Sequence, residues 1–159
     1  MVSFDIQPAR SPHDITVAGE MFREYQQWLG VDLCFQDFEA ELAGLPGKYV
    51  PPGGEIFIAR AADAVAGIVA VRGLPWISDE MSEMKRLYVR ENWRGHGLGR
   101  RLAELVIDFA RGAGYRKMVL DTLPHLAAAI GMYGQMGFAK TKPYYENPLP
   151  GVVYMEKIL

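Results

Sequence analysis

Glycine stands at every second position of one short segment, at Gly95, Gly97 and Gly99, directly before an amphipathic pattern typical of a helix. Glycines keep side chains away from the start of a helix, so several backbone N–H groups there can face one ligand at the positive end of the helix dipole. Arginines at positions 94, 100 and 101 add positive charge at the same end. Together these features suit a pyrophosphate group. The alternative is a tight turn that binds nothing.

This glycine spacing differs from two common phosphate-binding patterns. A dinucleotide fingerprint needs Gly-x-Gly-x-x-Gly, and a Walker loop needs Gly-Lys followed by Ser or Thr. The segment from Val89 to Arg100 contains neither pattern. The sequence therefore indicates an anion site of another kind.

The net charge of −2 conceals an uneven distribution along the chain. Residues 1–82 carry five Lys and Arg against twelve Asp and Glu, a charge of −7, whereas residues 83–117 carry nine against four, a charge of +5. A basic segment inside an acidic chain favours a locally held anionic ligand over a nucleic acid that wraps the surface. The alternative is an ordinary solvated helix face.

Length and composition exclude several classes of protein. The 159 residues are half hydrophobic, which indicates one domain over residues 1–159. One cysteine, Cys34, cannot form an internal disulfide, and three scattered histidines give no zinc-ligand spacing, so we expect a cytoplasmic protein without a bound metal. We expect no membrane association, because no apolar run approaches the roughly 18 residues of a membrane span.

Local signals predict an alternation of helices and strands. Ser11 and Pro12 begin a helix that Gly30 ends, and a Pro- and Gly-rich stretch over 45–54 predicts a loop. The remaining expectations are a helix near 35–42, strands at 55–59, 64–71, 83–89, 118–120 and 152–158, a loop at 73–80, and helices at 97–112 and 126–136. This mixture predicts an α/β or α+β sandwich.

The segment Arg94-x-x-Gly97-x-Gly99 resembles the acyl-CoA signature of the GNAT family, the GCN5-related N-acetyltransferases. The resemblance continues through Leu120-Asp121-Thr122 and through the helical segment 129–138, which carries Tyr133 and closes at Gly137-Phe138. It implies a GNAT-type fold, in which helices flank a mixed, mostly antiparallel central sheet. It also implies acetyl-CoA as the acyl donor and direct attack by an amine, without a covalent enzyme intermediate.

The resemblance also implies where acetyl-CoA binds. The strand that ends at Val89 would separate from its neighbour and expose main-chain groups to the pantetheine arm, and the glycine loop would hold the pyrophosphate through backbone amides. The expected cofactor-binding residues are Leu87, Tyr88, Val89, Arg94, Gly95, His96, Gly97, Leu98, Gly99 and Arg100.

Two side chains match catalytic positions of the family. Tyr133 would protonate the departing thiolate, and Glu83 would take a proton from the attacking ammonium. The alternatives are a core aromatic side chain for Tyr133, an ordinary salt bridge to Lys85 or Arg86 for Glu83, and a water chain in place of a base.

The acceptor is less defined than the donor. We expect a primary amine of a small molecule or a peptide as acceptor, and a homodimer as the default assembly. The residues expected on the acceptor side are Glu39, Glu41, Tyr49, Trp76, Tyr144, Tyr145 and Glu146. A non-catalytic acyl-CoA sensor of the same fold is the main alternative. A toxin that acetylates aminoacyl-tRNA is disfavoured, because the basic cluster coincides with the CoA site.

Overall fold

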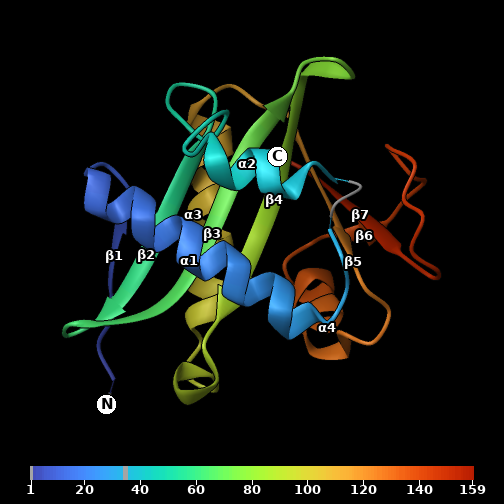
Figure 1. The fold of residues 1–159 in the computed structure, drawn as a ribbon. Helices are drawn as coiled ribbons and strands as arrows, with labels where there is room; N and C mark the ends of the chain where they lie inside the picture. The colour runs from blue at the N-terminus through green and yellow to red at the C-terminus, as the bar shows by residue number, and fades with distance from the viewer. Residues whose placement is uncertain (1, 34–35) are drawn as a thin grey trace.

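A seven-stranded sheet organises the computed structural model, which describes residues 2–33 and 36–159 (Figure 1). The strand order is β1-β2-β3-β4-β5-β7-β6. The strands are β1 (Asp5–Pro8), β2 (Glu55–Ala61), β3 (Ala64–Leu74), β4 (Ser78–Val89), β5 (Lys117–Thr122), β6 (Ala139–Lys140) and β7 (Val153–Ile158). All neighbours pair antiparallel except β4 and β5, so the predicted mixed, mostly antiparallel sheet is confirmed.

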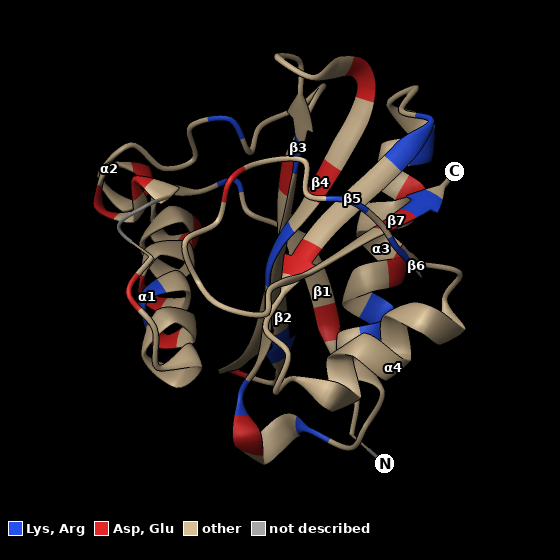
Figure 2. Cartoon of the chain, turned by 90° about the vertical axis from the view of Figure 1, so that its right-hand side faces the viewer, with Lys and Arg blue, Asp and Glu red and all other residues tan. Residues whose placement is uncertain are grey.

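Helices cover both faces of this sheet. Helices α1 (Pro12–Leu29) and α2 (Phe38–Ala43) lie on one face, and α3 (Leu98–Gly112) lies on the other, as the two perpendicular views show (Figures 1 and 2). Helix α4 (Ala127–Gln135) follows β5, and a short 3-10 turn, η2 (Glu91–Trp93), precedes α3. Each face has its own buried apolar cluster, one centred on α3 and one on α1.

The ends of α1 follow the sequence signals. Ser11 accepts a hydrogen bond from the Asp14 amide, and Asp14 accepts in return from the Ser11 amide, which is a capping box. Gly30 ends the helix at φ 73°, a left-handed conformation that glycine adopts without steric cost.

Two of the expected elements differ from the structure. The predicted loop at 73–80 is wrong, because β3 and β4 extend into a tight hairpin that leaves only 75–77 outside the strands. The second helix begins at Phe38; the predicted start at Phe35 and the single Cys34 lie outside the described residues. Within residues 2–33 and 36–159, no helix is long and apolar enough to cross a membrane.

Candidate active site

A cleft opens where β4 and β5 separate. The two strands pair in parallel only from Met81–Lys117 to Glu83–Val119. Beyond that point β4 continues along β3 to Val89, while β5 continues along β7 to Thr122. The cleft between them is bordered by α1 and α4, and residues from Gly99 at the start of α3 to Asp121 and Tyr133 line it.

A bulge in β4 helps to produce this separation. The register with β3 shifts between Ile68–Tyr88 and Ala70–Lys85, so β4 holds one extra residue there. Arg86 lies at this shift with φ 59°, which is uncommon for a residue other than glycine. A bulged strand bends and twists more strongly than a regular one. We therefore attribute the divergence of β4 from β5 in part to this bulge.

The end of β4 presents the edge that was expected to hold pantetheine. Leu87 and Val89 line the cleft, whereas the Tyr88 ring packs against Tyr25 and Trp28 of α1. The Val89 carbonyl accepts a hydrogen bond from Nε of Arg94 at 2.8 Å. The strand thus directs two apolar side chains toward the cleft and one aromatic side chain toward α1.

The glycine loop has the backbone that an anion site requires. Gly95 and Gly97 have φ of 83° and 77°, and a Cβ added at either residue would meet no atom within 4 Å. The first amides of any helix lack an intrahelical acceptor. Gly97, the N-cap of α3, has no side chain that could supply one instead. Open space and free donors at a helix N-terminus fit a phosphate group.

The side chains of this loop point to other partners. The Arg94 guanidinium lies 4.9 Å from the centre of the Trp28 ring, and Arg100 pairs with Glu104. Leu98 is buried in the core, and the exposed His96 has its ring 6.4 Å from that of Phe4. The loop would therefore bind a phosphate mainly through its backbone.

Ion pairs use most of the excess charge of the basic segment. Arg86 pairs with Glu41, Arg90 with Glu24 and Arg116 with Glu80, so acids from residues 1–82 neutralise three of its bases directly. Among the described residues, Arg94 and Arg101 of the loop region have no carboxylate within 4.0 Å. Positive charge near α3 is thus smaller than the linear count of +5 suggests.

Tyr133 lies in α4 and faces the cleft. Its side chain is buried, and in the described part of the chain its hydroxyl makes no hydrogen bond. Burial, with smaller contributions from Tyr25 and Asp121, raises the pKa of Tyr133 above that of an ordinary phenol. The hydroxyl is therefore protonated near neutral pH and has a proton to donate.

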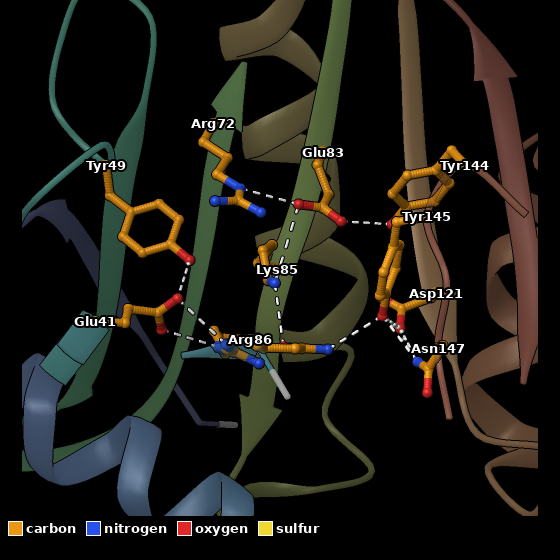
Figure 3. Close-up of polar contacts among 11 residues, drawn as sticks. Glu41, Tyr49, Arg72, Glu83, Lys85, Arg86, Asp121, Tyr144, Tyr145 and Asn147 are labelled. Carbon is orange, nitrogen blue, oxygen red and sulfur yellow. Dashed lines mark hydrogen bonds and ion pairs between the residues drawn. The ribbon is translucent and has the colours of Figure 1, made fainter. Parts of the chain in front are cut away.

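Glu83 is held by other side chains of the sheet (Figure 3). Its carboxylate is 2% exposed and accepts hydrogen bonds from Arg72 Nε at 3.0 Å and from the Tyr144 hydroxyl. Lys85 Nζ lies 4.0 Å away. The ion pair therefore forms with Arg72, and more loosely with Lys85, rather than with Arg86. Glu83 is not among the residues that line the cleft.

Asp121 is a site residue to which sequence reasoning gave no role. It lines the cleft near the end of β5 and accepts hydrogen bonds from the Tyr145 hydroxyl and from Asn147 Nδ2 (Figure 3). No Lys or Arg of the described chain lies within 4.0 Å of its carboxylate. The signal available in the sequence was a lone acid after a buried strand, twelve positions before Tyr133.

The segment that follows β6 closes over these groups. The hydroxyls of Tyr144 and Tyr145 reach Glu83 and Asp121, and their rings pack against Tyr154 of β7. The two tyrosines that were expected on the acceptor side therefore join the polar network between β4 and β5. Glu41 and Tyr49 form a separate cluster with Arg86, in which Glu41 accepts hydrogen bonds from both of the others.

Comparisons with known proteins agree on one class of protein. The protein-family model described as "Acetyltransferase (GNAT) family" matches residues 18–138 of this chain. An uncharacterized N-acetyltransferase of Schizosaccharomyces pombe is 42% identical over 154 residues, which cover 96% of this chain and 93% of that relative.

Solved structures show the same fold at lower identity. An acetyltransferase from Streptococcus agalactiae matches with TM-score 0.79 and 22% identity over 98% of both chains. A putative acetyltransferase from Salmonella typhimurium, described with its cofactor acetyl-CoA, matches with TM-score 0.73 and 20% identity over 98% of this chain and 93% of that one. The fold and the matched segment define an acyl-CoA-type acetyltransferase. The chain belongs to the GNAT family.

Proposed function

We propose that this protein transfers the acetyl group of acetyl-CoA to a primary amine of a small molecule or peptide, by direct attack within a ternary complex. The observation that carries the proposal is the continuous cleft between β4 and β5. It runs from Gly99, beside the glycine loop, to Tyr133 and Asp121. A donor held at the loop and an acceptor held near Asp121 would meet in one space.

The residues present fit acetyl-CoA as the donor. Gly95 and Gly97 leave room for the phosphates, and Leu87 and Val89 border the space for an extended arm. The family membership and the relative named as an N-acetyltransferase support this choice of donor. A solved structure of the same fold is described with acetyl-CoA.

Tyr133 is proposed as the proton donor to the leaving group. When the amine nitrogen bonds to the thioester carbon and the carbon–sulfur bond breaks, the sulfur leaves with the electron pair and takes a proton. The Tyr133 hydroxyl faces the cleft with its proton in place and with no acceptor among the described residues. Its raised pKa keeps the hydroxyl protonated at neutral pH.

Asp121 is proposed as the first acceptor of the ammonium proton, and Glu83, the residue favoured by the family resemblance, is the competing candidate. The Asp121 carboxylate lines the cleft and has no cation partner within 4.0 Å in the described chain. The Glu83 carboxylate is already occupied by Arg72 and Tyr144. A base must reach the proton that it removes, and this geometry favours Asp121.

The test is a panel of amines and peptides, assayed for CoA release and for the acetylated product by mass spectrometry. Calorimetry with acetyl-CoA alone measures the donor site separately. CoA release that depends on an amine and yields its amide supports the proposal. Acetyl-CoA binding without release for any amine would instead indicate the non-catalytic sensor.

A further inference from the structure

Lys85 is a buried cation at the cleft with few partners. It is 8% exposed and lines the cleft, although ammonium groups are seldom buried without full compensation. Its Nζ donates one hydrogen bond, to Oε1 of Gln36 at 3.2 Å, and lies 4.0 Å from Glu83. An ammonium group has three donors, so two of them lack an acceptor among the described side chains.

The neighbouring acids are committed to other cations. Glu83 accepts from Arg72 and Tyr144, and Glu41 accepts from both Arg86 and Tyr49. Burial lowers the pKa of Lys85, and the attraction of Glu83, with a smaller contribution from Asp121, offsets only part of that effect. A ligand in the cleft can therefore supply acceptors for the remaining Lys85 donors.

A chain of hydrogen bonds connects Lys85 to Asp121. Gln36 accepts from Lys85 and donates its Nε2 to the Tyr145 hydroxyl at 3.1 Å, and Tyr145 donates to Asp121 (Figure 3). The cleft therefore has a cation at one end of this chain and, at the other, a carboxylate with no Lys or Arg of the described residues within 4.0 Å. Gln36 and Tyr145 fix the spacing between the two charges.

We infer that the acceptor is an amine that also carries a carboxylate, such as an α-amino acid, with its carboxylate on Lys85 and its ammonium on Asp121. The inference rests on the proposed function and specifies its substrate class. A zwitterion with adjacent charges of opposite sign complements the two ends of the chain.

Other classes of amine fit less well. A polyamine would place a second ammonium group against Lys85, and like charges in a desolvated site repel strongly. A neutral alkylamine would bury Lys85 further without supplying an acceptor, which costs free energy. The carboxylate thus decides between amines of equal size.

The first arm of the test uses matched substrates with the wild-type protein. L-Leucine, L-leucine amide and 3-methylbutylamine share one side chain, and L-phenylalanine, its amide and 2-phenylethylamine form a second set. We expect kcat/KM at least about tenfold higher for the carboxylate member of each set, which corresponds to about 1.4 kcal/mol. Equal or better use of the amide or alkylamine would overturn the inference and leave the acetyltransferase proposal intact.

The second arm uses Lys85→Met, which keeps the length of the side chain and removes its charge. The ratio of kcat/KM for the carboxylate substrate to kcat/KM for its amide should fall toward one, while the affinity for acetyl-CoA stays unchanged. Lys140→Met, at an exposed position of β6, is the matched control and should keep the preference. A preference that persists in Lys85→Met would overturn the assignment of Lys85.

The third arm separates binding from turnover. Calorimetry titrates each L-amino acid and its amide into the protein saturated with CoA. Binding of the amino acid that is lost with the amide supports the inference even if no CoA is released, in which case only the proposed function fails. Absence of binding by every carboxylate-bearing amine overturns the inference, and this result does not depend on the folding of a variant.

Discussion

Arg86 and Glu41 form a two-pronged ion pair between the bulge of β4 and helix α2. Nε and one terminal nitrogen of Arg86 donate to the two carboxylate oxygens at 3.1 and 3.2 Å, and the arginine side chain is 3% exposed. Because Arg86 also lines the cleft, this pair ties α2 to the strand that borders the cleft. Removing one partner of a buried pair leaves an uncompensated charge.

We expect Glu41→Gln to reduce the free energy of unfolding by about 3 kcal/mol, at the lower end of the usual range because Glu41 is partly accessible. Urea unfolding measures the loss. Glu39→Gln, which breaks the exposed pair with Arg23, is the control and should cost much less, because solvent screens that pair. Equal losses in the two variants would contradict the role of the buried pair.

The same pair predicts loss of stability in acid. Burial alone would raise the pKa of Glu41, but the Arg86 guanidinium outweighs burial and holds the pKa below its usual value. A carboxylate with a lower pKa in the folded than in the unfolded state stabilises the fold above its unfolded pKa of about 4.3, and this contribution is lost as the pH falls through the folded value. The Glu41→Gln variant should show a weaker dependence of unfolding free energy on pH below about 4.

Gly97→Asp should weaken acetyl-CoA binding at least about tenfold, or about 1.4 kcal/mol. The substitution places a side chain and a negative charge at the N-terminus of α3 and imposes L-residue strain at φ 77°. Gly114→Asp is the matched control, because Gly114 also has a positive φ and open space but follows the other end of α3. Calorimetry compares them, and similar affinities would remove the loop from the donor site.

Tyr133→Phe should lower kcat by about 10² to 10⁴ while acetyl-CoA affinity changes little. The change removes one hydroxyl that has no hydrogen bond in the described chain, so the packing of the ring against Phe138 is retained. Tyr115→Phe, which removes a hydroxyl bonded to the Gly53 carbonyl outside the cleft, serves as the control. Unchanged kcat in Tyr133→Phe would exclude it as the proton donor.

Local signals in the sequence predicted the elements that carry the donor site. Ser11 and Gly30 predicted the two ends of α1, and the glycines at 95, 97 and 99 predicted where α3 begins. These signals act over a few residues, where backbone preference and capping decide the structure. The hairpin at 73–80 was missed because polar residues such as Ser78 and Asp79 do not resemble a strand, yet they extend β4 beside β3.

The polar network between Lys85 and Asp121 could not be predicted from local sequence signals. Lys85 joins Asp121 through Gln36 and Tyr145, which lie 109 positions apart in sequence and meet only in the folded sheet. The linear charge count failed for the same reason, since Arg86 and Arg90 find their acids on α2 and α1. Pairing across the fold decides which charges remain available to a ligand.

The pH dependence of two variants distinguishes Asp121 from Glu83 as the proton acceptor. Without its base, the enzyme can use only acceptor that is already deprotonated, so Asp121→Asn should lose rate at neutral pH and regain about tenfold per pH unit toward the pKa of the amine. Glu83→Gln should keep the wild-type pH profile of kcat/KM, since it alters the hydrogen bonds of Arg72 and Tyr144 rather than a group that lines the cleft. Profiles measured with one acceptor on both variants, alongside their unfolding free energies, separate catalytic from structural losses. If the alkaline recovery instead appears in Glu83→Gln, the base lies on β4 and Asp121 only orients the acceptor.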